Sequence, residues 1–395
     1  MNKPWFRYLS SLLVAAASIA TALAARPQSA SRPRTSRVLE IPMATEDRVR
    51  EPGWWPTKGT PARSEFAGAE ACAQCHAQKA RTQSDTPMAR TSMKAEYSSI
   101  LRQHEELNTR LGKWSYQLVR KPDGSVMSVS DGETTDSARL SWAFGIGHLG
   151  QTYIFERNGA FYESHLSYYS AIDGLDITPG HSNSEPTNSE TGLGRRLDNS
   201  ETHLCFGCHT TASTTSGRFD LEHLMNSVTC EACHGPGAKH VAAMEAGQTE
   251  KGAKLIFNPS TLPPVASVEF CGACHRTLVD VSLIEMYGIR NVRFQPYRLE
   301  TSKCWGQGDA RLTCTTCHDP HQQVGHDPGS YDHACLQCHT SGKQSQATVR
   351  AGKTCPIEKT NCVACHMQKY EIPGMHSKFT DHRIRIAREG APFPD

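Results

Sequence analysis

Seven copies of the pattern Cys-x-x-Cys-His occur in this chain of 395 residues, and with two cysteines each they use 14 of its 16 cysteines. Two thiols at this spacing can add to the two vinyl groups of one porphyrin, and the histidine that follows is placed to bind its iron. The pattern therefore predicts seven covalently bound haem c groups. The attachment cysteines and iron-binding histidines are Cys72, Cys75 and His76; Cys205, Cys208 and His209; Cys230, Cys233 and His234; Cys271, Cys274 and His275; Cys314, Cys317 and His318; Cys335, Cys338 and His339; Cys362, Cys365 and His366.

Other uses of cysteine explain the pattern less well. A zinc site needs two Cys-x-x-Cys pairs that converge, and zinc binding does not require a histidine directly after each pair. A thioredoxin-like redox motif occurs once, near a βαβ unit. A disulfide framework accounts for the cysteines but not for the histidines. The two cysteines outside the motifs, Cys304 and Cys355, suggest a disulfide in an exported protein, with free thiols as the alternative.

The second axial ligand of each iron decides whether a haem only carries electrons or also has room for a substrate. Of 19 histidines, seven lie in the motifs and 12 remain, so histidine could bind both sides of every iron. The candidate second ligands are His240, His321, His376, His382, His148, His203, His333 and Met88. Met88 follows the first motif and could instead pack against the ring. The histidines expected to be ordinary polar residues are His104, His165, His181, His223 and His326.

The first residues are typical of a secretory signal peptide. Lys3 and Arg7 precede an apolar run over 9–23, and Ala22-Leu23-Ala24 fits a cleavage site. The run is short for a membrane span, so we expect cleavage rather than anchoring. The mature chain contains no later candidate span, and the sequence predicts a periplasmic or extracellular protein.

The charge balance argues against a nucleic-acid partner. The chain has 42 basic and 40 acidic side chains, and loss of Lys3 and Arg7 with the signal peptide would leave 40 of each. Haem propionates would then make the holoprotein acidic, and no basic stripe remains. We expect periplasmic or membrane redox proteins with a positive docking face as partners. The mean hydropathy of −0.52 is low, so we also expect haem binding to be coupled to folding and the haem-free C-terminal half to be largely unfolded.

Motif spacing divides the chain into five parts. Residues 1–24 form the predicted signal peptide, and the proline-rich residues 25–66 form a linker. Residues 67–104 carry the first motif, and residues 105–204 form a β-rich insert and loop. Residues 205–395 form a domain that carries the other six motifs.

The insert shows two predicted hairpins. Alternating residues over 114–119 and 126–129 flank a Pro-Asp-Gly turn, and residues 151–157 and 160–164 flank Asn158-Gly159. We expect its aromatic residues to form a core rather than a binding face. They are Trp114, Tyr116, Trp142, Phe144, Tyr153, Phe155, Phe161, Tyr162, Tyr168 and Tyr169.

The crowding of motifs after residue 205 predicts short helices, including 238–246 and 268–274. We therefore expect a mostly α-helical and irregular multihaem cytochrome c fold, with short helices and long loops wrapped around haems, plus the small β-rich insert. The motif spacing is irregular, which excludes a solenoid repeat.

Four segments resemble multihaem c-type cytochromes related to the cytochrome c-554 group: residues 230–240, 293–304, 314–321 and 379–382. The resemblance covers the haem-bearing parts and little of residues 105–200. It implies closely stacked haem pairs, with His240 and His321 as second ligands. The tetrahaem members have fewer motifs than this chain, so their haem order does not transfer.

Two functions follow from these features. The first is an exported cytochrome that transfers electrons between redox partners through closely packed haems, without catalysis. The second is a multihaem oxidoreductase that acts on a small nitrogen or sulfur compound at a five-coordinate haem. The two differ in the second axial ligand of each iron.

Overall fold

The computed structural model describes residues 62–215, 218–283, 285–306, 312–339, 355–387 and 390–394. These residues belong to one compact unit, Ile41–Asp395. The predicted signal peptide and nearly all of the predicted linker lie outside the described residues. Within the described ranges, none of the helices has the length and apolar character that a membrane span requires. The predicted domain boundaries remain predictions.

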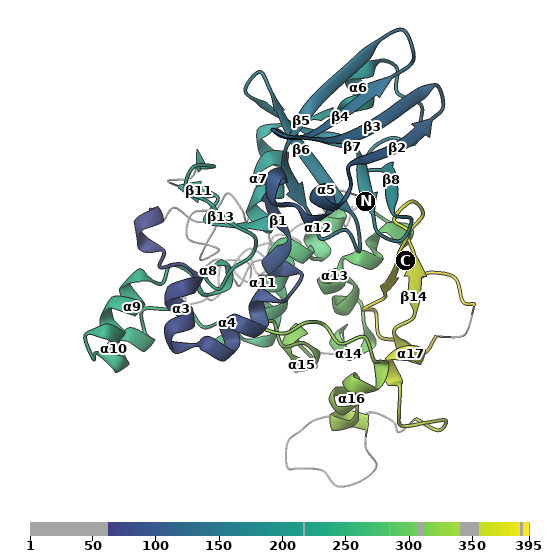
Figure 1. Ribbon diagram of the computed structural model, residues 1–395. Helices are drawn as coiled ribbons and strands as arrows, with labels where there is room; N and C mark the ends of the chain where they lie inside the picture. Colours follow the sequence, from purple (N-terminus) through teal and green to yellow (C-terminus); the bar gives the residue numbers. More distant parts are fainter. Residues whose placement is uncertain are drawn as a thin grey trace, which may run out of the picture. The chain divides into compact units, whose positions relative to one another are not determined.

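A nine-stranded antiparallel sheet occupies the region after the first motif, with the strand order β2-β3-β4-β5-β6-β7-β8 (Figure 1). In addition, β1 pairs with β5 and β9 pairs with β7. Strand β2 also contacts β8, so the two ends of the sheet approach each other. The strands are β1 (Ser92–Lys94), β2 (Glu106–Leu111), β3 (Trp114–Lys121), β4 (Gly124–Ser130), β5 (Thr135–Phe144), β6 (Gln151–Arg157), β7 (Ala160–Tyr169), β8 (Gly174–Ile177) and β9 (Gly194–Arg196).

Apolar and polar side chains alternate along these segments, which explains why they form a sheet with one buried face. In β3, Trp114, Tyr116 and Leu118 are buried while their neighbours are exposed, as a period of two requires. They join Met127 and Val129 of β4 in the largest apolar core cluster of the described chain. Most of the aromatic residues expected in the core are buried, which confirms that expectation for them.

Both predicted hairpins are confirmed. Strands β3 and β4 pair from Ser115 with Ser130 to Lys121 with Gly124. Strands β6 and β7 pair as far as Arg157 with Ala160, so the turn is Asn158-Gly159. Both turn residues have positive φ, 52° and 73°, which suits asparagine and glycine.

The predicted fold class is wrong, because the β structure is a large sheet and not a small insert. The prediction missed β5, a ten-residue strand that links the two hairpins. The register between β5 and β6 shifts between Leu140 and Trp142. A bulge of this kind breaks strict alternation, so the pattern of β5 was hard to recognise from the sequence.

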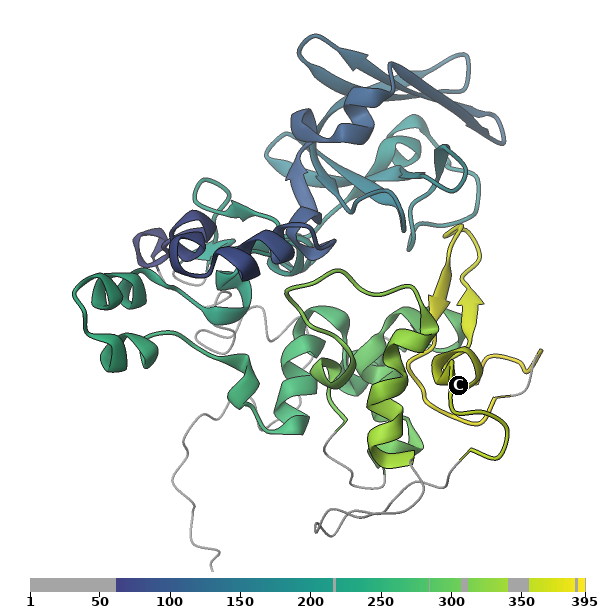
Figure 2. The same cartoon turned by 60° about the horizontal axis from the view of Figure 1, so that its bottom comes forward.

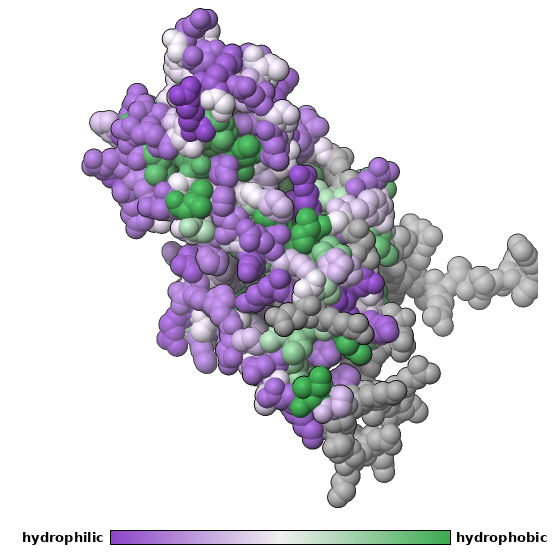
Figure 3. Space-filling model, turned by 90° about the vertical axis from the view of Figure 1, so that its right-hand side faces the viewer, coloured by the Kyte–Doolittle hydropathy of each residue, from purple (hydrophilic) through white to green (hydrophobic). Residues whose placement is uncertain are grey.

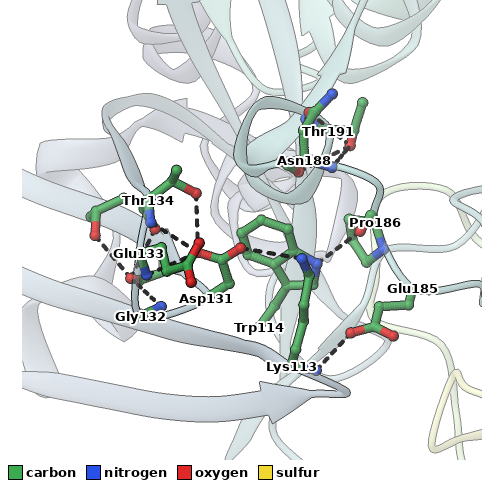
Figure 4. Close-up of polar contacts among 12 residues, drawn as sticks. Lys113, Trp114, Asp131, Gly132, Glu133, Thr134, Glu185, Pro186, Asn188 and Thr191 are labelled. Atoms are coloured by element: carbon green, nitrogen blue, oxygen red, sulfur yellow. Dashed lines mark hydrogen bonds and ion pairs between the residues drawn. The ribbon is translucent and has the colours of Figure 1, made fainter.

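Polar contacts close one end of the sheet (Figure 4). The indole of Trp114 donates a 2.8 Å hydrogen bond to the Pro186 carbonyl, and the Lys113 backbone N–H donates to Glu185. The Asp131 carboxylate accepts from the backbone of Glu133 and Thr134 and tightens the turn between β4 and β5. The two contacts of Trp114 and Lys113 hold the loop before α6 (Ser189–Leu193) against the sheet.

Short helices make up most of the rest. The predicted helices are confirmed as α9 (Ala238–Glu245) and α11 (Pro264–His275). The remaining described α-helices are α3 (Ala69–Cys75), α4 (Ala77–Ser84), α5 (Ser99–Gln103), α7 (Asn199–His209), α8 (Glu231–His234), α10 (Thr249–Ala253), α12 (Leu278–Leu283), α13 (Gln295–Glu300), α14 (Lys303–Gly306), α15 (Cys314–Cys317), α16 (Asp332–His339) and α17 (Cys362–His366).

Minor elements complete the chain. The 3-10 helices are η1 (Arg63–Glu65), η2 (Met88–Arg90), η3 (Ala95–Tyr97), η4 (Pro259–Thr261), η5 (Gly288–Arg293) and η6 (Pro328–Tyr331). The short strands are β10 (Thr210–Thr211), β11 (Thr214–Thr215), β12 (Arg218–Phe219), β13 (Met225–Asn226), β14 (Lys369–Glu371) and β15 (Lys378–Thr380). The hairpin β14–β15 is drawn in yellow in Figure 2.

Apolar clusters outside the sheet are small. One contains Val292, Ile372, Met375 and Phe379, which joins η5 to the β14–β15 hairpin. The face in Figure 3 is mostly polar, with apolar side chains in separate patches. Among the described residues, the apolar clusters of the helical part are smaller than that of the sheet, and the mean hydropathy of the chain is low, −0.52.

Candidate haem-attachment sites

All of the motifs lie on helices: α3, α7, α8, α11, α15, α16 and α17. Residues three and four apart share one face of a helix, so the second thiol and the histidine lie on the same side as the first thiol. No disulfide joins any of the motif cysteines. In α7, α11, α16 and α17, which contain all three motif residues, two sulfurs and one imidazole therefore share one face. In α3, α8 and α15, one motif residue directly adjoins the helix: His76, Cys230 and His318. Two thiols and an imidazole are a donor set that fits a covalently attached porphyrin with an axial histidine.

The first cysteines of different motifs meet in pairs. The thiol pairs in hydrogen-bond contact are Cys72 with Cys230, Cys271 with Cys314, and Cys335 with Cys362. In the first pair, the hydrogen bond to Cys230 is the main reason why the pKa of Cys72 lies above its usual value. The first motif therefore adjoins the third, the fourth adjoins the fifth, and the sixth adjoins the seventh.

Two buried carboxylates hold two of these pairs together, and sequence reasoning missed both. Glu231, between the cysteines of the third motif, accepts hydrogen bonds from the N–H groups of Ala67 (2.8 Å) and Gly68 (2.9 Å), just before α3. Asp332, at the start of α16, accepts from the N–H groups of Asn361 (2.7 Å) and Cys362 (2.8 Å), at the start of α17. An acidic residue inside or just before a motif is the signal that could have found them.

Further contacts connect the pairs. The Cys208 thiol lies 3.7 Å from the Ala273 carbonyl and so links the second motif to the fourth. The sulfur of Cys317 lies near enough to Cys335 to raise its pKa, although burial is the larger cause, so the fifth motif adjoins the sixth.

Two pairs of histidine rings stand at the separation that two ligands of one iron require. The ring centroids of His234 and His321 are 6.0 Å apart, and those of His318 and His382 are 6.2 Å apart. A metal–imidazole bond is about 2 Å long, so two imidazoles on opposite sides of one metal have centroids roughly 6 Å apart. The structure thus brings two sequence-predicted second ligands to histidines of the third and fifth motifs.

Hydrogen bonds at Nδ1 leave the other ring nitrogen available in several of these histidines. Nδ1 of His234, His240 and His382 donates to the carbonyl of Phe257, Gly252 and Thr380, at 2.9, 2.8 and 3.0 Å. Metal-binding histidines commonly donate the other ring N–H in this way. Burial lowers the pKa of His382 to about 4, so its ring is neutral, the form that binds metals.

Other predicted second ligands are placed less favourably. Nε2 of His376 is bonded to the Asp176 carboxylate at 2.7 Å, and the ring packs on Tyr169. The rings of His203 and His333 are bonded through Nδ1 to the carbonyls of Asn199 and Ser330, which leaves Nε2 available as in His240, but both of these hydrogen bonds are exposed. His148 is exposed on a loop.

Three sulfur-bearing residues outside the attachment motifs were considered from the sequence: Met88, Cys304 and Cys355. Met88 lies half-buried in η2, where its carbonyl accepts a hydrogen bond from the Val228 N–H. Cys304 and Cys355 are not joined by a disulfide. The structure therefore offers no support for the disulfide that two spare cysteines suggested.

A cavity of about 330 Å³ adjoins the second motif. Cys205 and His209 line it together with Glu163 and Tyr169 from β7 and with Arg293 from η5. The cavity is lined by the first thiol and the imidazole of the second motif, and the sheet supplies much of its wall. The sheet, which sequence reasoning treated separately from the haems, therefore contributes to a haem site.

Repeated presentation of two thiols and one imidazole, with adjoining motifs and paired histidines, defines a multihaem c-type cytochrome site. Residues 177–235 match the family model for cytochrome c554 and c-prime, and this segment contains the second and third motifs. The match supports placing the chain among multihaem c-type cytochromes.

Comparison with whole proteins adds little. No curated protein matches the chain. Among solved structures, the outer cell wall cytochrome OcwA is similar with 14% identity and a TM-score of 0.44, over 81% of this chain and 80% of that chain. That similarity is too weak to assign the fold.

Proposed function

We propose that this protein is an exported heptahaem c-type cytochrome that transfers electrons between redox partners through closely packed haems. The observation that carries the proposal is that each attachment motif contacts at least one other. Covalent attachment at adjoining helices would keep neighbouring porphyrins close, and no substrate site is needed for electron transfer.

The contacts define a branched path. One branch runs from the first motif to the third through Cys72 and Cys230, and on to the fifth, because His321 lies three residues after His318. A second branch runs from the second motif through the fourth to the fifth. The third branch continues from the fifth motif to the sixth and seventh. The fifth motif is the junction.

Ligand assignments follow from the same contacts. His321 would complete the iron bound by His234, and His382 would complete the iron bound by His318. His240, whose Nδ1 is bonded to a carbonyl in a partly buried contact, is a candidate second ligand for another iron, as are His203 and His333 with exposed contacts of the same kind. Histidine on both sides suits haems that only carry electrons.

The proposed location is periplasmic or extracellular, since c-type haems are attached outside the cytoplasmic membrane. The partners would be periplasmic or membrane redox proteins. The acidic holoprotein would favour partners that present a positive face.

The proposal is tested by measuring how fast one added electron distributes among the haems. The oxidised holoprotein is mixed with one electron equivalent of a small reductant, and its optical and EPR spectra are followed with time. A connected path predicts that the electron distributes among all haems according to their potentials within the mixing time. Slow exchange between separate groups of haems would contradict the path.

A further inference from the structure

The cavity beside the second motif is lined by one histidine, His209 of the motif itself, and every histidine of the chain lies within the described residues. His148 is next to the lining residue Leu149 in sequence but is exposed. His376 packs on Tyr169 behind the lining, and its Nε2 is already bonded to Asp176.

The lining contains one arginine, Arg293, with a buried nitrogen that lacks a hydrogen-bond partner. In the part of the chain that the structure describes, the side chain of Arg293 is half-buried, its guanidinium lies 5.3 Å from the centre of the Phe294 ring, and its Nε is buried without a hydrogen-bond partner. Burial and then the positive charges of Arg276 and Arg290 lower the pKa of Arg293, so three arginines lie near one another. A buried guanidinium nitrogen without an acceptor is costly, and an anionic group is the acceptor that suits it best.

The acidic residue of the lining does not neutralise this charge. The Glu163 carboxylate lies 2.8 Å from Arg195 and 3.1 Å from Nε2 of His181, so it already has partners. Arg195 also forms an ion pair with Glu201. Among the lining residues, Arg293 therefore carries a positive charge that the one acidic residue of the lining does not neutralise.

We propose that this cavity binds a small anion, such as an oxoanion of nitrogen or sulfur, beside the iron of the second haem, and that Arg293 supplies the charge that holds it. The proposal rests on the proposed haem attachment at Cys205 and Cys208. A propionate of the same haem offers the same chemistry as an external carboxylate or oxoanion, and the experiment separates the two sources.

Nitrite is the probe, and the oxidised holoprotein is the sample. Nitrite is titrated into the wild type, R293Q, the charge-conserving R293K, and R102Q, which removes an exposed arginine of α5 outside the cavity lining. EPR follows the ferric haems. Carbon monoxide binding to the reduced proteins reports on a neutral ligand at the same iron.

The proposal predicts a high-spin ferric signal in the wild type that nitrite changes. R293Q should weaken nitrite binding about tenfold or more, because a hydrogen bond to a charged group contributes roughly 1.5–3 kcal/mol. R293K should retain part of the affinity, R102Q should match the wild type, and carbon monoxide affinity should be similar in all four proteins.

Two results would overturn the proposal. If R293Q binds nitrite like the wild type but shifts the potential of the second haem, Arg293 holds a propionate. If the wild type shows only low-spin haem that H148A or H376A converts to high spin, a histidine occupies the iron. In either case the electron-transfer function stands, whereas a missing haem at Cys205 and Cys208, seen by peptide mass mapping, would instead defeat the proposed function.

Discussion

A buried ion pair stands directly beside one of the proposed iron ligands. The Arg298 guanidinium donates two hydrogen bonds to the Asp381 carboxylate, at 2.8 and 3.0 Å, and both side chains are almost fully buried. Arg298 also donates to Asn291 and to the Pro394 carbonyl. Because His382 follows Asp381, this network positions a ring that is proposed to bind the fifth haem.

Replacing Asp381 with asparagine should loosen that ligand. Removing one partner of a buried pair costs about 3–5 kcal/mol, since the other charge stays buried. We expect D381N to convert part of one low-spin ferric EPR signal to high spin and to lower the melting temperature. R298K, which keeps the charge, should show a smaller change, and the exposed K378Q is the control. An unchanged EPR spectrum in a destabilised D381N would mean that the ion pair has only a structural role.

An ion pair in the sheet predicts how stability depends on pH. Arg157 donates to both oxygens of Asp136, at 2.9 and 2.8 Å, and this hydrogen bonding holds the pKa of Asp136 below its usual range. A depressed pKa stabilises the fold above the unfolded value of about 3.9 and loses that effect as pH falls through the folded value.

We therefore expect D136N to lower stability by about 0.5–1 kcal/mol near neutral pH, because the pair is partly exposed. The deficit should shrink as the pH falls below about 4, where the wild-type carboxylate also becomes protonated. Thermal melts of both holoproteins across this range provide the measurement. A deficit that is constant with pH would contradict the role given to the carboxylate charge.

The sequence could predict which residues take part in a haem site only where those residues lie close together in the chain. The Cys-x-x-Cys-His residues need no knowledge of the fold. The partners of His234 and His318 come from distant parts of the chain, so sequence alone could name His321 and His382 as candidates but not match them to an iron. Arg293 carried no local signal, because its importance arises from a cavity formed by distant elements.

At the scale of elements, local patterns predicted the helices and hairpins that stand alone. The turn at Asn158-Gly159 and helix α11 depend on short-range signals, and both are present. Strand β5 forms by pairing with β4 on one side and β6 on the other, and its register with β6 shifts. Its side chains therefore do not alternate strictly between apolar and polar, and sequence reasoning missed the strand. The size of the sheet follows from that one strand, since β5 joins the two hairpins.

The carboxylate of Glu231 should stabilise the packing of two helices, because its hydrogen bonds connect α8 to the residues just before α3. E231A would leave the N–H groups of Ala67, Gly68 and Gly237 without their acceptor, at a cost of about 1–3 kcal/mol for each one that water does not reach. Hydrogen exchange of a peptide covering residues 66–76 should become faster in E231A. The exposed E70Q on α3 is the matched control, and equal exchange in both variants would exclude the tie.

For the whole molecule, the two parts should respond differently to loss of haem. The sheet has its own aromatic core, whereas the described apolar clusters of the helical part are smaller. We expect haem-free protein to retain protease-resistant fragments within residues 92–196 and to lose resistance after residue 230. A haem-free chain that melts cooperatively, with all of its helices, would contradict the coupling of haem binding to folding.

The central claim is a connected set of covalently bound haems, one at each of the seven motifs. Mass spectrometry of the denatured holoprotein tests it most directly, because thioether-bound haem survives denaturation. We predict the mass of the processed chain plus seven haems, with each motif peptide carrying one haem and only Cys304 and Cys355 open to alkylation after reduction. A motif whose cysteines are alkylated and carry no haem would break the path at that point and contradict the claim.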